Sequence, residues 1–303
     1  MDTATQLDLS DALTQYQTTF MASRNLADAT RRHYLIDLAD VLRFLKELGI
    51  TTAQQVHRRH LEAYLAELDR RGFKGSTRRR KIAAIRSLFS FLEDQGHLTV
   101  SPAAKLIPPE QERPQPRVLS KAEYERLRDQ VKTYGNNRDE AIIEVLLQTG
   151  MRLSELTRLS VQDLELPAKI SRDQAHVGTV TILGKGRKTR TLTLNYKAVS
   201  ALKRWLTVRG DSTNPPHLFL SNFKNGMTPR AIEHAVEKYL KLAGIQHASV
   251  HTLRHTFATH HVKNKTSLRS VQQMLGHASL KTTEIYVHLA RDQMDKEMQD
   301  NAL

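Results

Sequence analysis

The feature that most constrains the fold is a proline-rich segment about one third of the way along the chain. The prolines within residues 102–116 are Pro102, Pro108, Pro109, Pro114 and Pro116. Such a segment cannot continue a helix and favours an extended, semi-rigid path. Because the chain has 303 residues, the pieces on either side are each long enough to bury a core. We therefore predict two domains joined by a linker.

The part before the linker has the apolar periodicity of helices. Leucines repeat at helical spacing from Leu35 to Leu45, and Gly49 ends that predicted helix. A second helix is predicted over residues 55–71. A third follows Ser76, which we expect to be its N-cap. This part is therefore predicted to be a small helical domain.

The part after the linker combines helices with one β-hairpin. Residues 177–194 alternate apolar and polar side chains in the strand pattern, with Gly184-Lys-Gly186 as the turn. Helices are predicted around residues 120–132, 137–149, 153–160, 196–208, 228–243, 252–264 and 267–275. The fold class is therefore mainly α, with a small β-hairpin or sheet in the second domain.

The charge of the chain indicates a polyanionic partner. Its net charge is +14, and residues 238–283 contain seven Lys or Arg and no Asp or Glu. A surface without carboxylates over such a length suits a phosphate backbone. The chain has no cysteine, no apolar run of about 18 residues and no signal-peptide pattern at its start. We therefore expect a cytoplasmic nucleic-acid-binding protein without disulfides and without a membrane partner.

A basic cluster lies around the start of the third predicted helix. From residue 70 to residue 86 there are eight Lys or Arg and no Asp or Glu. Charge runs of this kind are usually solvated helix faces. A helix start also favours phosphate through its amide dipoles, so we predict contacts with a nucleic-acid backbone. The residues assigned to these contacts are Arg78, Arg79, Arg80, Lys81 and Arg86.

Tyr286 is the candidate nucleophile. A tyrosine hydroxyl has an unperturbed pKa of about 10, so at neutral pH it needs a base and a polarised electrophile. Guanidinium groups offer a fork of donors that matches phosphate oxygens. The basic and proton-carrying residues in motifs around the second domain are Arg152, Lys185, His251, Arg254 and His277. This set predicts attack on a phosphodiester.

The sequence fits two other kinds of site poorly. A nucleotide-phosphate loop has four residues between its two glycines, whereas five residues separate Gly178 from Gly184. Gly186 also stands at the position where that motif requires Ser or Thr. Five histidines within residues 247–261 suggest zinc, but their helix offers no Glu between them. We therefore predict neither a metal nor a cofactor.

The ordered motifs resemble the tyrosine recombinase family, of the phage-integrase type. The motifs are Thr149-Gly-Met-Arg-Leu-Ser-Glu-Leu156, Gly184-Lys-Gly-Arg-Lys188, His251-Thr-Leu-Arg-His255, Leu275-Gly-His277 and Thr282-Thr-Glu-Ile-Tyr-Val-His288. The likeness covers roughly residues 117–290 and is nearest to Xer-like and transposon-type members. It implies a helical, SAM-like core-binding domain over residues 1–107, a linker over 108–116 and a mixed α+β catalytic domain over 117–303. The two domains would close around duplex DNA as a C-shaped clamp.

The resemblance also implies roles for the site residues. Tyr286 would attack the scissile phosphate and form a 3′-phosphotyrosyl link, while Lys185 would protonate the leaving 5′-oxygen. His251 would help to deprotonate Tyr286, and His277 would donate to a nonbridging oxygen.

Other positions have supporting roles in the same scheme. Arg152 and Arg254 would hold the phosphate, and Glu155 would orient its neighbours. Arg187 and Lys188 would contact DNA beside Lys185. The remaining residues near the second arginine, which we expect to pack rather than to catalyse, are His255, Phe257 and His260.

The implied reaction is site-specific recombination without metal or nucleotide. It would use double-stranded DNA with short inverted-repeat core sites and a homotetramer on two duplexes, with a Holliday junction as intermediate. Accessory DNA-bound proteins would be further partners, and the location would be the bacterial or archaeal nucleoid. Two alternatives stay open, a type IB topoisomerase and an inactive architectural DNA-binding protein. The tail over residues 291–303 would either dock on a neighbouring protomer or fray.

Overall fold

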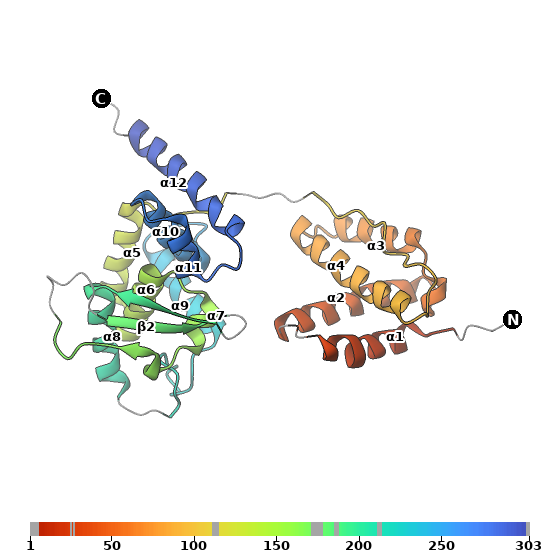
Figure 1. Ribbon diagram of the computed structural model, residues 1–303, viewed down its shortest axis with the longest axis horizontal. Helices are drawn as coiled ribbons and strands as arrows, with labels where there is room; N and C mark the ends of the chain where they lie inside the picture. Colours follow the sequence, from red (N-terminus) through yellow and green to blue (C-terminus); the bar gives the residue numbers. More distant parts are fainter. Residues whose placement is uncertain are drawn as a thin grey trace. The chain divides into compact units, whose positions relative to one another are not determined.

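The computed structural model describes residues 6–24, 26, 28–110, 115–170, 178–184, 188–210 and 214–300. The chain divides into two compact units, Met1–Pro114 and Gln115–Leu303, called here the N-terminal and C-terminal units (Figure 1). This division falls inside the proline-rich segment. Both units are mainly helical and a small antiparallel sheet lies in the second, so the predicted fold class is confirmed.

The N-terminal unit is made of helices only within its described residues. Its elements are α1 (Leu9–Gln15), the π-helix η1 (Tyr16–Met21), α2 (Asp28–Glu47), the 3-10 turn η2 (Ala53–Gln55), α3 (Arg58–Arg70) and α4 (Gly75–Asp94). Helices α2, α3 and α4 correspond to the three predicted helices. Their leucine, isoleucine and phenylalanine stripes meet in one core, which also contains Tyr16 and Tyr64.

Two local features of this unit differ from the sequence prediction. Helix α4 begins at Gly75 with Lys74 as its N-cap residue, so the expectation that Ser76 caps it is wrong. The first helix pair, α1 and η1, was not predicted. Asp8 caps α1 by accepting a hydrogen bond from the backbone N–H of Ser10, a local signal that its sequence carries.

The C-terminal unit is built around helix α6. Its helices are α5 (Lys121–Tyr134), α6 (Asn137–Thr149), α7 (Leu153–Arg158), α8 (Tyr196–Arg209), α9 (Pro229–Leu242), α10 (Val250–Lys263), α11 (Leu268–Leu275) and α12 (Lys281–Asp300). Residues 141–147 of α6 are all buried, because α5, α8, α9, α10 and the sheet pack around this helix. Helix α12 was not predicted, and it carries the Tyr286 segment.

The sheet has three strands in the order β1 (Leu164–Glu165), β2 (Gly178–Leu183) and β3 (Thr189–Leu194), all antiparallel. Strands β2 and β3 form the β-hairpin that the alternating side chains predicted, with Val180 opposite Leu192. The inward residues of β3 are Leu192 and Leu194, and Arg190 follows the same alternation. This places an arginine on the side of the strand that faces the core.

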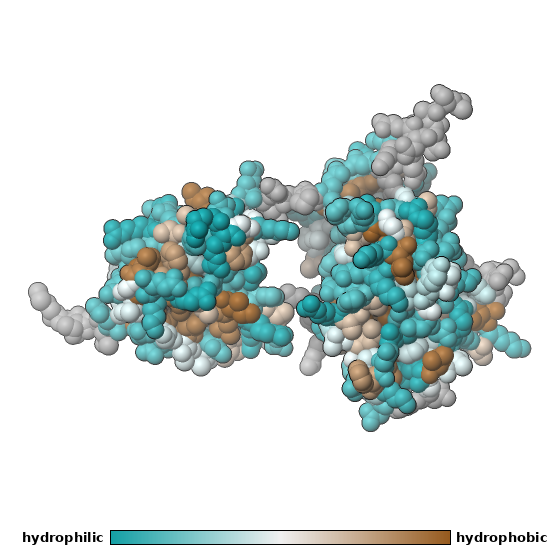
Figure 2. Space-filling model, turned by 180° about the vertical axis from the view of Figure 1, so that it is seen from behind, coloured by the Kyte–Doolittle hydropathy of each residue, from teal (hydrophilic) through white to brown (hydrophobic). Residues whose placement is uncertain are grey.

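Most of the molecular surface that Figure 2 shows is hydrophilic on each unit, with hydrophobic residues scattered between. The most exposed large hydrophobic residues, Phe223 and Ile107, belong to different units. None of the described helices is long and apolar enough to cross a membrane.

A buried ion cluster joins α2, α3 and α4 in the N-terminal unit. The Lys81 ammonium lies 2.8 Å from an Asp40 oxygen, 3.3 Å from an Asp37 oxygen and 3.2 Å from the Tyr64 hydroxyl. Lys81 is 4% exposed and Asp37 is 1% exposed, and Arg80 is also paired with Asp37. Lys81 is therefore part of the core in this structure, and its enclosed charge does not favour the predicted DNA contact, which stays a prediction.

Replacing Lys81 with methionine should lower the free energy of unfolding by about 3 kcal/mol, because Asp37 loses a buried counter-charge. The matched control is Arg58→Met, which breaks the exposed Arg58–Glu62 pair and should change stability by less than about 1 kcal/mol. Urea unfolding of the full chain, followed by circular dichroism, measures both. Equal losses in the two variants would contradict the structural role of Lys81.

Candidate active site

Arg152 is placed by the end of α6 and the start of α7. Gly150 ends α6 with a φ of +57°, and a Cβ at that position would lie 2.4 Å from the Phe257 ring. Only glycine fits that turn, which brings Arg152 to the N-cap position of α7. The Arg152 backbone N–H donates to Glu155 at 2.8 Å, and its Nη1 donates to the other carboxylate oxygen at 3.0 Å. The Arg152 side chain is 37% exposed, so a ligand can reach it.

Arg254 lies in the first half of α10 and is buried. Its Nη1 donates to the carbonyl of Gly150 at 2.6 Å and its Nη2 donates to the carbonyl of Leu275 at 2.8 Å. Burial, with a smaller contribution from the charge of Arg152, lowers the pKa of Arg254 to about 10. The guanidinium is still charged at neutral pH, and its position is fixed by two carbonyls from separate elements.

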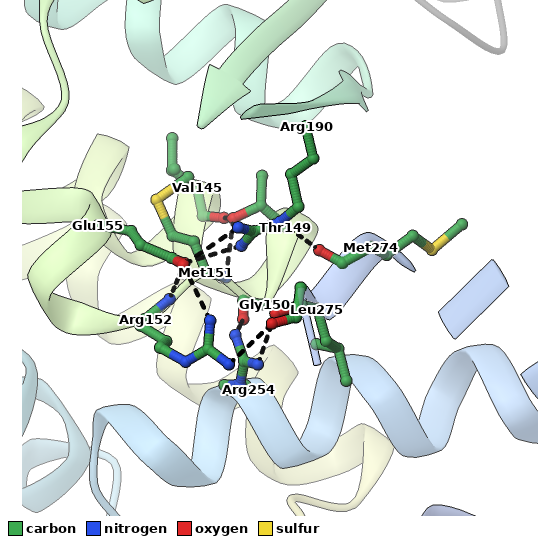
Figure 3. Close-up of polar contacts among 11 residues, drawn as sticks. Val145, Thr149, Gly150, Met151, Arg152, Glu155, Arg190, Arg254, Met274 and Leu275 are labelled. Atoms are coloured by element: carbon green, nitrogen blue, oxygen red, sulfur yellow. Dashed lines mark hydrogen bonds and ion pairs between the residues drawn. The ribbon is translucent and has the colours of Figure 1, made fainter. Parts of the chain in front are cut away.

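Three consecutive carbonyls at the end of α11 each accept a hydrogen bond from a different arginine (Figure 3). Met274 accepts from Arg190 Nε at 2.7 Å, and Gly276 accepts from Arg152 Nη2 at 3.1 Å. Leu275, between them, accepts from Arg254. Carbonyls at a helix C-terminus have no partner within the helix and carry the negative end of its dipole, so cations suit them.

His277 follows directly after this helix end. Its Nδ1 is 3.0 Å from the hydroxyl of Thr283, which is fully buried. Burial, followed by the charges of Arg254 and Arg152, lowers the pKa of His277 to about 4. The ring is therefore neutral at pH 7. In the tautomer in which Nδ1 accepts from the Thr283 hydroxyl, the proton is on Nε2, where it can be donated.

Tyr286, on α12, lies against the same group of residues. Its ring is stacked with the His277 ring at 6.2 Å between centroids, and it is only 2% exposed. Burial raises the pKa of Tyr286, and the charges of Arg254 and Arg152 offset part of that rise. The hydroxyl is therefore protonated and covered in the DNA-free protein.

The histidine in hydrogen-bond contact with the Tyr286 hydroxyl is His255. Its Nδ1 lies 3.1 Å from the Tyr286 hydroxyl, whereas His251 lies exposed at the first turn of α10. Burial, then the charges of His251 and Arg254, lower the pKa of His255 to about 4, so the ring is neutral and able to accept a proton. We expected His255 only to pack, and that expectation missed its contact with the candidate nucleophile.

The hairpin tip lies only partly within the described residues. Lys185 and Arg187 are outside them, so their predicted roles stay predictions. Lys188 is exposed, and its carbonyl accepts the backbone N–H of Gly184 at 2.8 Å, which closes the base of the tip.

The predicted DNA contacts on α4 all have partners within the N-terminal unit. Arg78 pairs with Asp69, and Arg79 and Arg86 donate to carbonyls of Pro109 and Leu106 in the proline-rich segment. Arg80 pairs with Asp37. These four side chains are half-buried and stay predicted contacts, whereas Lys81 is enclosed in the ion cluster.

Arg190 is a second residue of the candidate site that the sequence prediction missed. Both of its Nη atoms donate to Glu155, at 3.1 Å and 2.8 Å. A signal for it was present: a charged residue in register with the buried Leu192 and Leu194 requires a buried partner. No group of three histidine, aspartate or glutamate side chains among the described residues is arranged as a metal site.

Comparison with known proteins identifies the class of protein. The chain belongs to the phage integrase family, the tyrosine recombinases: a model of that family matches residues 117–293, and a model of its N-terminal SAM-like domain matches residues 13–96. It is 34% identical over 285 residues to the tyrosine recombinase XerC of Pseudomonas fluorescens, covering 93% of this chain and 92% of that protein.

Two solved structures share the fold. The XerH recombinase in a post-cleavage complex with palindromic difH substrate has a TM-score of 0.75 at 23% identity, over 94% of this chain and 83% of that one. A lambda integrase tetramer bound to a Holliday junction has a TM-score of 0.75 at 16% identity, over 93% and 78%. Both likenesses extend over the two units.

The neutral, buried histidines predict how stability depends on pH. His255 and His277 have pKa values of about 4 when folded, against about 6.5 when unfolded. Between these values the unfolded chain binds protons that the folded protein does not, so the free energy of unfolding should fall as the pH drops through this window. The variant with both His255→Gln and His277→Gln should lose less stability there, by on the order of 1–3 kcal/mol.

Urea unfolding at several pH values between about 4 and 7 measures this difference. A matched control is His234→Gln together with His247→Gln, two positions on the surface. If the His255/His277 variant followed the parent curve, the two rings would not be held neutral by burial.

Proposed function

We propose that this protein is a site-specific DNA recombinase that cleaves one strand with Tyr286 and rejoins it to another. The observation that carries the proposal is the position of the Tyr286 hydroxyl. It lies in hydrogen-bond contact with a neutral histidine and within the electrostatic reach of two fixed arginines, all from the same unit. Family membership and the XerC relative support the same activity.

The cleavage step follows from the chemistry of these groups. Arg152 and Arg254 bind the nonbridging oxygens of the scissile phosphate and stabilise the charge that grows in the transition state. His277 donates from its free ring nitrogen to the same phosphate. The Tyr286 oxygen attacks phosphorus and the 5′-oxygen leaves. The phosphate keeps its bond to the 3′-oxygen of the cleaved strand and is now also bonded to the tyrosine.

Two proton transfers accompany the attack. The Tyr286 proton passes to a histidine of α10: His255 touches the hydroxyl, and His251 lies one helical turn earlier on the same helix. The leaving 5′-oxygen takes its proton from Lys185, a role that rests on the family resemblance. Reversal of the step with a 5′-hydroxyl from a second duplex completes strand exchange.

The partner is duplex DNA. The net charge of +14 and the acid-free stretch over residues 238–283, which contains α10 and α11, support contact with a phosphate backbone. By analogy with the lambda integrase tetramer on a Holliday junction, we propose that four protomers act on two duplexes with short inverted-repeat sites. Accessory DNA-bound proteins and a docking role for the end of α12 are further parts of this proposal.

Two alternatives predict different products. A type IB topoisomerase would relax supercoils without joining two separate DNA molecules. An architectural protein would bind DNA without forming any adduct. The 34% identity to XerC favours recombination. Dimer resolution, cointegrate resolution and phage or transposon integration would use the same residues, so the target DNA distinguishes them.

Tyr286→Phe should abolish cleavage and leave DNA binding intact, because only the hydroxyl is lost. The measurement is covalent trapping in EDTA on nicked duplexes, read on a denaturing gel, with affinity measured separately at several salt concentrations. Tyr239→Phe is the matched control, since it removes another buried tyrosine hydroxyl from the same unit and should still form the adduct. An adduct formed by Tyr286→Phe, or none formed by the parent on any fragment, would contradict the proposal.

A further inference from the structure

Arg190 occupies an unusual position for an arginine. It lies on β3 in register with two buried leucines, and its side chain is only 12% exposed. Its three guanidinium nitrogens all have acceptors: Nε donates to Met274, and the two Nη atoms donate to Glu155. Because these nitrogens are occupied by protein and the side chain is nearly covered, Arg190 is poorly placed to bind a phosphate itself.

Glu155 stands between Arg190 and the phosphate-binding Arg152. Its carboxylate side chain is 6% exposed and accepts from both guanidinium groups and from the Arg152 backbone N–H. A buried carboxylate needs a counter-charge. If Arg190 were absent, Arg152 would be the only guanidinium within hydrogen-bond distance of Glu155, and its charge would be held there instead of being offered to DNA.

Arg190 also fixes the end of α11. It holds the Met274 carbonyl, and the next two carbonyls orient Arg254 and Arg152. A Cβ at position 276 would lie 3.0 Å from Arg190 Nη1, and the glycine there has a φ of +62°. The helix end and the guanidinium are therefore fitted to each other, immediately before His277.

We propose that Arg190 is a positioning residue for DNA cleavage: it neutralises Glu155, which leaves Arg152 free for the phosphate, and it holds the α11 end that aims Arg254. This inference rests on the proposed recombinase function. It also ties the strand that follows Lys185 in the sequence to the two phosphate-binding arginines. Arg190 acts through its neighbours and does not touch the DNA.

The variants separate charge from shape. Arg190→Gln removes the charge and should lower the rate of adduct formation by roughly 100-fold, with DNA affinity close to that of the parent. Arg190→Lys keeps the charge but cannot donate to both Glu155 oxygens and the Met274 carbonyl at once. Its cleavage rate should therefore lie between those of the parent and of Arg190→Gln. In a Glu155→Gln background, Arg190→Gln should cost much less than it does in the parent, because the carboxylate it neutralises is gone.

The pH profile gives a readout that a loss of folding would not produce. Burial raises the pKa of Glu155, but the hydrogen bonds from Arg190 and from the Arg152 N–H, with the charges of both arginines, bring it below its usual range. The charged side chains that act on Glu155 are therefore Arg190 on β3 and Arg152 before α7, with Arg254 of α10 also nearby. Arg190→Gln should move the acid limb of the cleavage rate to higher pH.

The deciding experiment measures single-turnover adduct formation on a nicked duplex at saturating protein, across pH, together with DNA affinity. The variants are Arg190→Gln, Arg190→Lys, Glu155→Gln, the double Arg190→Gln/Glu155→Gln, and Arg204→Gln. Arg204→Gln is the control, since it breaks an arginine–glutamate pair on the surface of the same unit and should cleave like the parent. Should Arg190→Gln not fold, the double variant carries neither charge of the buried pair, and it should cleave at close to the rate of Glu155→Gln.

A cleavage rate for Arg190→Gln equal to that of the parent overturns the proposal, and so does a variant that loses DNA affinity but no cleavage rate. The proposal also fails if Arg190→Gln lowers the cleavage rate by the same factor in the Glu155→Gln background as in the parent. A second arm needs no DNA: carbon-13 NMR of the Glu155 carboxyl in the free protein should show its pKa rising in Arg190→Gln. An unchanged Glu155 titration overturns the Arg190–Glu155 link. If the parent itself forms no adduct, the recombinase function fails, and the NMR arm still decides that link.

Discussion

The C-terminal end of α11 is the point on which the site depends. Three carbonyls in succession, those of Met274, Leu275 and Gly276, accept from three arginines that come from different parts of the chain. These arginines would repel one another if no negative group lay between them. The helix-end carbonyls and the buried Glu155 supply that negative charge, so a concentrated positive site can exist before any phosphate arrives.

The same arrangement leaves the candidate nucleophile buried and protonated in the DNA-free protein. Tyr286 is 2% exposed, its pKa is raised by burial, and its hydroxyl is held by the neutral His255. His277 is neutral for the same reason, since burial and two nearby arginines oppose a further positive charge. Under the proposed function, DNA binding has to uncover the hydroxyl and bring the phosphate to guanidinium groups that are already aimed.

Periodicity predicted most helices of both units and the β2–β3 hairpin, because buried stripes and strand alternation are local properties of the sequence. What it missed depends on contacts between distant segments. Lys81 was predicted to face DNA, but two aspartates of α2 lie next to it, about 40 residues away in sequence. Arg190 and His255 join the candidate site only through partners on other elements, and neither a charge count nor a spacing rule identifies those partners. The order of the basic motifs was informative, since the family they predicted is the one found by comparison.

The most direct test of the central claim is to map the protein–DNA linkage chemically. The adduct would be trapped on a nicked duplex, digested with nuclease and protease, and analysed by mass spectrometry, while the released strand is tested for a free 5′-hydroxyl by kinase labelling. We predict a nucleotide on the peptide that contains Tyr286, linked through its 3′-phosphate, and a released strand that the kinase labels directly. A nucleotide on any other residue, or linkage through a 5′-phosphate, would contradict the assignment of Tyr286 as the nucleophile.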